Sequence, residues 1–126
     1  MTMITPNHLS TDKIKRGDVI LIPFPNSDLH TAKLRPALII QSDDLDTGLF
    51  QVILAMISSN LDRAGHRSRI PIKIETELGK ESGLLLDSVI MTDNLATVSL
   101  SRIVRIIGAI NKMDAIDAAL RHTLKL

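Results

Sequence analysis

Three side chains that could act on a phosphate stand at the ends of apolar segments or beside them: Arg35, Ser58 and His30. Arg35 precedes the apolar run 36–40. Since proline fixes its own φ and favours an extended residue before it, the arginine is expected at the mouth of a buried strand. Ser58 directly follows a second apolar run. A guanidinium, a hydroxyl and an imidazole together suit attack of an RNA 2′-hydroxyl on its adjacent phosphate. That reaction needs cations for the developing negative charge and proton transfer at two oxygens.

The two apolar runs predict neighbouring strands over about 35–41 and 50–57, each nearly continuous in apolar residues and therefore buried on both faces. If these strands pair antiparallel, the start of the first lies beside the end of the second. Arg35 and Ser58 would then meet at the same edge of the sheet. Because a guanidinium does not lose its proton readily, Arg35 is interpreted as a phosphate clamp and transition-state stabiliser.

Two polar loops are expected to reach this pair from either side. Loop 26–33 carries His30, whose ordinary pKa suits proton transfer near neutral pH. Loop 61–69 is rich in arginine, and cationic side chains bind phosphates irrespective of base sequence. The roles of general base and acid stay open between His30 and Ser58 acting with a water. The candidate RNA contacts in and beside these loops are Lys33, Ser59, Asn60 and Arg67.

Each candidate also has an ordinary structural explanation. An arginine before a proline at a strand start is commonly a surface charge that opposes aggregation. A serine after a strand commonly terminates it, a histidine in a polar loop is commonly just solvated, and a basic loop is most simply a solvated surface. For metals, no paired histidine spacing indicates a site. The aspartates at positions 43, 44 and 46 lack the glutamate that closes a calcium loop.

The rest of the chain predicts short strands separated by turns. Pro23 and Pro25 are expected to end the first strand, since proline cannot donate to a ladder. Residues 78–83 are expected to form a connection, residues 92–94 a break between two strands, and Gly108 a bulge or close backbone approach. The further strands are expected over 19–22, 70–74, 88–91, 95–99 and 104–110.

One amphipathic helix is predicted at the C-terminal end, with Asn111 as its N-cap and an ion pair between Asp117 and Arg121. Residues 100–103 are expected to form a single helical turn capped by Ser99. Six or seven short strands joined by turns exclude an α/β crossover fold. They favour a mainly β structure, a small bent barrel with the helix packed on it, in a single domain over 13–126. The apolar stripe of the helix is Met113, Ile116, Leu120 and Leu124.

Residues 1–12 are interpreted as a tail outside this domain. They show no period, and Met1–Thr5 resembles the start of the β-galactosidase fragment in cloning vectors, so a vector-derived origin is one interpretation. The absence of cysteine excludes disulfides and thiolate metal sites and favours a reducing, cytoplasmic setting. A net charge of +1 gives little global attraction for nucleic acid. With two phenylalanines and no Trp or Tyr, RNA binding cannot rest on aromatic stacking.

Two motifs give the chain a family resemblance. Residues 15–25 (KRGDVILIPFP), followed by residues 33–40 (KLRPALII), resemble the paired motifs of the MazF/PemK-type toxins of toxin–antitoxin operons. Residues 55–59 (AMISS) look like the hydroxyl-ended third strand of that family, and 85–90 and 101–108 look like its later strands. The resemblance covers about 13–126, and the spacing of its two motifs is more specific than either motif alone.

The resemblance implies an SH3-like barrel that works as a homodimer. It also implies sequence-specific cleavage of single-stranded RNA, without metal or cofactor, to a 2′,3′-cyclic phosphate. Arg35 matches the family's catalytic arginine, which is then a third candidate for the proton transfer, and Ser58 matches its catalytic threonine or serine. Asp93 falls near an acidic residue that some members use, which makes it a further RNA-binding candidate. The implied partner is an antitoxin whose disordered acidic tail lies in the RNA groove. Met91 and Ala96 stand where members carry arginine.

Two other functions stay open on the same barrel. A catalytically weak or silent relative would bind RNA or antitoxin without cleaving. A protein-binding toxin of the gyrase-poisoning kind would share the fold, but such toxins resemble a barrel with an aromatic C-terminal helix. This chain ends in Arg121–Leu126 (RHTLKL), without Trp. The endoribonuclease toxin is the preferred hypothesis.

Overall fold

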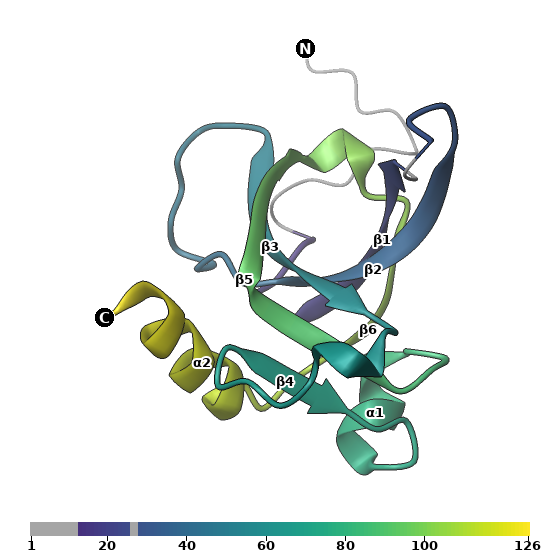
Figure 1. Ribbon diagram of the computed structural model, residues 1–126. Helices are drawn as coiled ribbons and strands as arrows, with labels where there is room; N and C mark the ends of the chain where they lie inside the picture. The colour runs from purple at the N-terminus through teal and green to yellow at the C-terminus, as the bar shows by residue number, and fades with distance from the viewer. Residues whose placement is uncertain (1–12, 26–27) are drawn as a thin grey trace.

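The computed structural model describes residues 13–25 and 28–126, so the interpretation of residues 1–12 as a tail lies outside the described residues. Six strands form one antiparallel sheet in the order β4-β5-β3-β2-β1-β6. The sheet curls into an open half-barrel (Figure 1), which confirms the predicted small, bent, mainly β fold. The strands are β1 (Asp18–Pro25), β2 (Ala32–Ile39), β3 (Gln51–Ser58), β4 (Arg69–Ile72), β5 (Ser88–Ser99) and β6 (Arg105–Ala109).

The curled sheet carries a hydrophobic core on each face, because successive side chains of a strand point to opposite faces. The face that we call the barrel face is covered by η2 (Leu100–Arg102) and the segment before β1. Its buried residues are Ile14, Ile20, Ile22, Ala37, Ile39, Val52, Leu54, Met56, Leu100 and Ile103. The helix face packs against α2 (Asp114–Leu124). Its buried residues are Val19, Leu38, Ala55, Ile57, Ile72, Leu84, Ile90, Ile110 and Ile116.

Pro23 and Pro25 do not end β1, so that prediction is wrong. β1 stays paired with β2 through Pro25 opposite Ala32. The reason is the direction of the backbone: Leu21 O accepts from Val104 N at 2.9 Å, on the side of β1 away from β2. Pro23 O likewise accepts from Arg102 Nη2 at 3.1 Å. Prolines at these alternate positions have no donor to lose toward β2.

Residues 92–94, expected as a break between two strands, form a bulge within the single strand β5. Ala55 of β3 pairs with Leu95 and the next residue, Met56, pairs with Met91, so 92–94 are left without an opposite residue. A bulge of this kind bends a strand. The bend lets the N-terminal half of β5 also pair with β4, which is an edge strand.

Residues 78–83 are not a plain connection but belong largely to the short helix α1 (Glu77–Ser82). Its first turn is capped by Thr76 Oγ1, which accepts from Gly79 N at 3.0 Å. Gly83 ends it in the left-handed region, at φ 74°. The close approach predicted at Gly108 is confirmed, since a Cβ there would lie 2.4 Å from Ser82 O.

The C-terminal helix is confirmed, but it begins at Asp114, and Met113 precedes it without a side-chain cap. The prediction of Asn111 as N-cap is therefore wrong. Asp117 Oδ1 accepts from Arg16 Nη2 at 2.6 Å, in place of the predicted pair with Arg121. The turn η2 is capped by Ser99 as predicted. Among the helices of residues 13–25 and 28–126, none is long and apolar enough to cross a membrane.

Candidate active site

Arg35 of β2 and Ser58 of β3 lie just beyond the point where the ladder between these two strands ends. The ladder between these strands includes Ala37 opposite Met56 and continues no further towards Arg35. Extending this register by two residues on each strand places Arg35 opposite Ser58. Both residues are partly buried. Both residues thus lie at the same end of the β2–β3 ladder, as antiparallel strand order predicted, and their direct meeting stays a prediction.

Pro36 explains why the ladder ends between them. Pro36 lies opposite Leu21 of β1, and the carbonyl of Leu21 points away from β2, toward Val104. This pair therefore exchanges no hydrogen bonds, and the nitrogen of Pro36 faces β3. Since proline has no N–H, β2 has nothing to donate to β3 at this position. The ladder ends there, and we call the space beyond its last pair, between Arg35 and Ser58, the gap.

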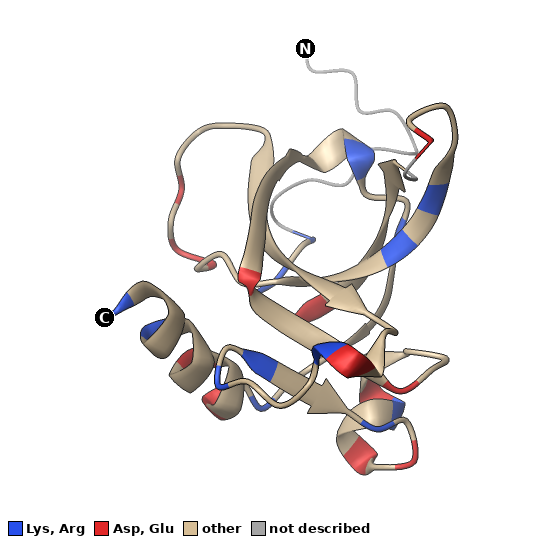
Figure 2. Cartoon of the chain, in the orientation of Figure 1, with Lys and Arg blue, Asp and Glu red and all other residues tan. Residues whose placement is uncertain are grey.

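The two side chains also share a face of the sheet. Residues two apart in a strand point to the same face of a sheet. Arg35 is two residues from Ala37, and Ser58 is two residues from Met56, so both lie on the barrel face. Lys33 lies on the same face of β2 and is exposed. Figure 2 shows this concentration of positive charge as the blue segments of β2. The arrangement offers cationic donors on one side of the gap and a hydroxyl on the other.

The Ser58 hydroxyl has a defined orientation. Asn60 N donates to Ser58 Oγ at 3.1 Å, which occupies a lone pair and leaves the hydroxyl proton to donate elsewhere. Asn60 Oδ1 in turn accepts from Asp62 N at 3.1 Å and caps η1 (Leu61–Arg63). Three predicted RNA contacts are exposed along this segment: Ser59, Asn60 and Arg67.

His30 lies on the turn that precedes β2, and its side chain is exposed. Asp28 orders this turn, because its Oδ1 accepts from His30 N at 2.9 Å and from Thr31 N at 3.1 Å. The bond from the His30 backbone N–H is the largest cause of a lowered pKa for the Asp28 carboxyl. No hydrogen bond within the described residues joins the imidazole to Arg35 or Ser58. A role for His30 in the chemistry therefore stays a prediction.

Asp93 lies in the β5 bulge and is bound to another protein group. Its Oδ2 is 2.9 Å from Arg69 Nη2, and the hydrogen bond from Arg69 is the main cause that lowers the pKa of the Asp93 carboxyl. Arg69 Nη1 also donates to Arg63 O at 3.2 Å. Local sequence gives no signal for the pair, because its members lie 24 residues apart and meet only through the β4–β5 register.

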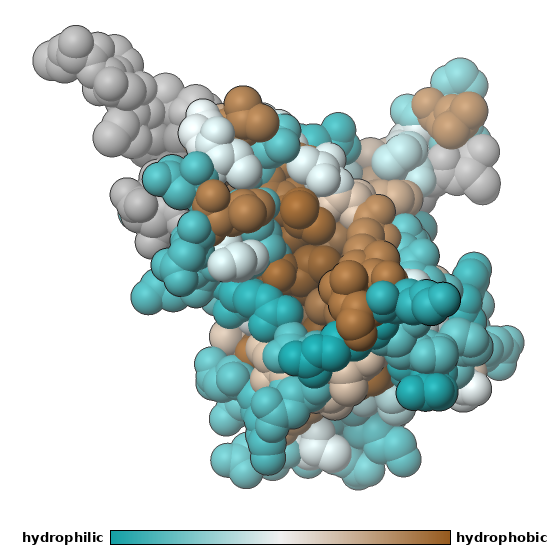
Figure 3. Space-filling model, turned by 90° about the vertical axis from the view of Figure 1, so that its left-hand side faces the viewer, coloured by the Kyte–Doolittle hydropathy of each residue, from teal (hydrophilic) through white to brown (hydrophobic). Residues whose placement is uncertain are grey.

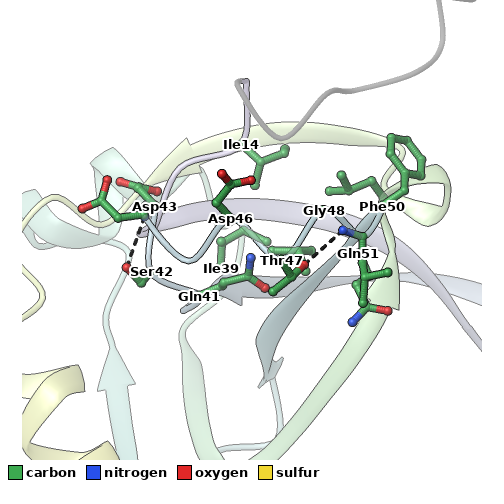
Figure 4. Close-up of a pocket in the computed structure, with 14 residues that line it drawn as sticks. Ile14, Ile39, Gln41, Ser42, Asp43, Asp46, Thr47, Gly48, Phe50 and Gln51 are labelled. Atoms are coloured by element: carbon green, nitrogen blue, oxygen red, sulfur yellow. Dashed lines mark hydrogen bonds between the residues drawn. The ribbon is translucent and has the colours of Figure 1, made fainter.

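A pocket of about 660 Å³ lies at the opposite end of β2 and β3. Figure 4 shows Gln41, Asp43, Asp46 and Gln51 around it, and it contains none of the predicted site residues. Arg16 N donates to Asp43 Oδ1 at 2.8 Å, so this carboxylate serves the chain itself. In the described part of the chain, no three His, Asp or Glu side chains are grouped so as to hold a metal ion.

A second hollow, of about 570 Å³, lies between α2 and the outer side of β3 and β5. Figure 3 shows a band of hydrophobic side chains on this side of the molecule. Leu45, Leu124 and Leu126 remain 48%, 50% and 84% exposed. Contiguous exposed apolar surface of this kind marks interaction sites. The apolar residues that line the groove are Ile40, Leu45, Ile53, Leu95, Leu120, Leu124 and Leu126.

Comparison with known proteins finds one matching family and several similar solved structures. The family model described as "PemK-like, MazF-like toxin of type II toxin-antitoxin system" matches residues 15–124. An endoribonuclease from a mycobacterial species is similar in structure, with TM-score 0.66 and 19% identity over 90% of this chain and 92% of that one. The Mycobacterium tuberculosis toxin MazF-mt6 is similar with a TM-score of 0.64 and 22% identity, over 85% of this chain and 97% of that one. The MazE–MazF structure from Deinococcus radiodurans is similar with a TM-score of 0.66 and 15% identity, over 90% of this chain and 96% of that one. No curated protein sequence matches the chain.

Proposed function

The chain belongs to the PemK-like, MazF-like toxins of type II toxin–antitoxin systems, and we propose that it is an endoribonuclease cleaving single-stranded RNA at specific sequences. The observation that carries the proposal is that Arg35 and Ser58 lie at the same end of the β2–β3 ladder, where Pro36 interrupts it. A guanidinium and a hydroxyl on the two sides of one gap can both contact a phosphate that enters it. The similar mycobacterial structure is itself named an endoribonuclease.

In the proposed reaction, the RNA 2′-oxygen attacks the adjacent phosphorus and its proton passes to a general base. The bond from phosphorus to the 5′-oxygen breaks, and that oxygen takes a proton from a general acid. The products are a 2′,3′-cyclic phosphate and a 5′-hydroxyl. Arg35 supplies the positive charge that stabilises the transition state, so the charge balance requires no metal or cofactor. The base and acid are assigned among His30, Ser58 with a water, and Arg35 itself.

The Ser58 hydroxyl contributes a donor to the same phosphate. One of its two lone pairs already accepts from Asn60 N, so the proton and the second lone pair are left for substrate or water. Recognition of bases is assigned to the exposed polar groups on both sides of the gap, because two phenylalanines are the only aromatic residues in the composition. These RNA contacts are Lys33, Ser59, Asn60 and Arg67.

The proposal includes two protein partners. The first is a second copy of the chain, which would cover the apolar groove along α2 and the exposed Leu124 and Leu126. The second is a cognate antitoxin with an acidic disordered tail, whose carboxylates would compete with phosphates for Lys33 and Arg35. The deinococcal relative was solved as MazE–MazF, and a mycobacterial endoribonuclease was solved with its cognate antitoxin.

Purified protein incubated with a long single-stranded RNA in EDTA tests the proposal. We expect cleavage at a small set of related sequences, with 5′-hydroxyl ends downstream and cyclic phosphates upstream. Arg35→Ala should abolish cleavage, while Arg105→Ala, on the edge strand β6, should not. RNA that stays intact at high protein excess would favour the silent relative or the gyrase-type toxin.

A further inference from the structure

Residues 59–68 form the loop between β3 and β4. Arg69, which follows the loop as the first residue of β4, binds to it and restrains it. This guanidinium binds the Asp93 carboxylate through two nitrogens, with Nη2–Oδ2 at 2.9 Å and Nε–Oδ1 at 3.4 Å. Its third nitrogen, Nη1, donates to Arg63 O of η1 at 3.2 Å. One side chain thus ties the β5 bulge to the middle of the loop. The forked geometry of arginine is what makes this double connection possible.

The bulge that carries Asp93 is itself firmly held. Thr92, the preceding residue, is fully buried. Its N–H donates to Ser68 O at 2.9 Å, and its hydroxyl lies 2.8 Å from Thr123 Oγ1 on α2. The carboxylate therefore extends from a backbone fixed by both the sheet and the helix. Asp93 can restrain Arg69 because it is mounted on a rigid base.

The restraint on Arg63 passes along the loop to the active-site gap. Arg63 N donates to Asn60 O at 3.1 Å, and Asn60 N donates to Ser58 Oγ at 3.1 Å. Residues 59–67 are all exposed, and their ring contact, between His66 and His122 with centroids 6.1 Å apart, lies beyond η1. Hydrogen bonds therefore contribute much of the order of η1 and the residues before it, and an exposed segment held in this way opens easily when one is lost.

We propose that Asp93 is a positioning residue that acts through Arg69 and holds Asn60 and Arg67 where they bind RNA. The inference rests on the proposed endoribonuclease function and assigns Asp93 no direct contact with the substrate. Without the carboxylate, Arg69 loses its main partner, and its bond to Arg63 O is no longer held in place by the bulge. The loop then samples more conformations, and RNA binding weakens. Arg35 and Ser58 keep their places, because the sheet holds both.

Amide hydrogen exchange of the loop tests the restraint without any substrate. In Asp93→Asn, the amides of Asp62, Arg63 and Ala64 should exchange at least about fivefold faster than in the wild type. The matched control is Asp117→Asn. It removes the other ion pair of the described residues, Arg16–Asp117 at 2.6 Å, whose carboxylate is also about a third exposed. The control should leave the loop unchanged. Equal exchange in Asp93→Asn and wild type would overturn the proposal.

Cleavage kinetics test the consequence for RNA. Asp93→Asn should raise KM about fivefold and change kcat by less than about twofold, whereas Asp117→Asn should change neither. In an Arg69→Gln background, Asp93→Asn should have no further effect, because the partner through which it acts is gone. Effects on KM that multiply in the double variant would mean that Asp93 contacts RNA itself and would overturn the proposal. A fall in kcat at unchanged KM would do the same.

The two proposals can fail separately. If the wild-type protein cleaves no RNA, the endoribonuclease function is refuted, while the exchange experiment still decides whether Asp93 orders the loop. If the wild type cleaves RNA and loop exchange in Asp93→Asn is unchanged, the endoribonuclease function stands and the positioning role is refuted.

Discussion

Removing the Thr123 hydroxyl should lower the stability of the fold by a small and calculable amount. Thr123 Oγ1 lies 2.8 Å from Thr92 Oγ1 and 2.8 Å from Ala119 O. It connects the last turn of α2 to the buried bulge of β5. Valine has the same shape without the hydroxyl, so Thr123→Val removes the hydrogen bonds with little change in packing.

The magnitude follows from what is left behind. After the substitution, Thr92 Oγ1 can still donate to Ser68 O, 2.6 Å away, so no buried donor is left without an acceptor. The loss is then that of an ordinary hydrogen bond, about 1 kcal/mol, rather than the ~1–3 kcal/mol of an unsatisfied buried group. For a chain of this length, this corresponds to a fall in Tm of roughly 4 °C. Thr92→Val should cost a similar amount.

The measurement is urea unfolding followed by far-UV circular dichroism, since the chain has no Trp or Tyr to report fluorescence. Thr92→Val, Thr123→Val and the double variant form a mutant cycle. The double variant should be about 0.5–1 kcal/mol more stable than the sum of the single losses predicts. All variants are compared at one protein concentration, because dimer formation would make stability depend on it.

Additive losses in the cycle would refute the reasoning, since they would mean that the two hydroxyls do not bond. A loss of about 2–3 kcal/mol in Thr123→Val would also contradict it, because that size indicates a buried group left without a partner. Either result would remove the anchor on which the positioning of Asp93 depends.

Three further predictions concern other parts of the molecule. Gly108→Ala should destabilise by about 1–3 kcal/mol in the same unfolding assay, because its Cβ would lie 2.4 Å from Ser82 O, a backbone atom that cannot move alone. The amide shift of His30 should titrate with a midpoint below 3.8, since the Asp28 pKa is lowered and its bonds are lost only as pH falls through that pKa; a midpoint above 3.8 would contradict this. Leu124→Glu should yield monomers in sedimentation, whereas Leu29→Glu should not, because a charge in the α2 groove opposes burial against a second copy.

The placement of Arg35 and Ser58 at one end of the β2–β3 ladder could be predicted from sequence because it depends on few facts. Two neighbouring apolar strands pair antiparallel, and the residues before the first and after the second must then lie together. The C-terminal helix was predictable for a similar reason, since its apolar stripe repeats at helical spacing. Its start was not, because Asn111 has the residue type of a cap while the helix begins only at Asp114.

The errors arose where tertiary structure decides. Whether Pro23 interrupts a ladder depends on which neighbouring strand its nitrogen faces, and the sequence does not contain that direction. Helix α1 is short and contains a glycine, so its sequence shows no helical repeat of apolar residues. Thr76 and Gly83 are nevertheless typical residues for the two ends of a helix. The Arg69–Asp93 pair depends on strand register and on the bend at the bulge.

The central claim is that Arg35 and Ser58 form one RNA-cleaving centre at the gap between β2 and β3. The most direct test compares wild type, Arg35→Ala and Arg105→Ala on one single-stranded RNA in EDTA, with the cleavage ends mapped. We predict specific cleavage by the wild type and Arg105→Ala, and a loss of at least about 100-fold for Arg35→Ala with its fold intact. Equal cleavage by Arg35→Ala and wild type would contradict the account.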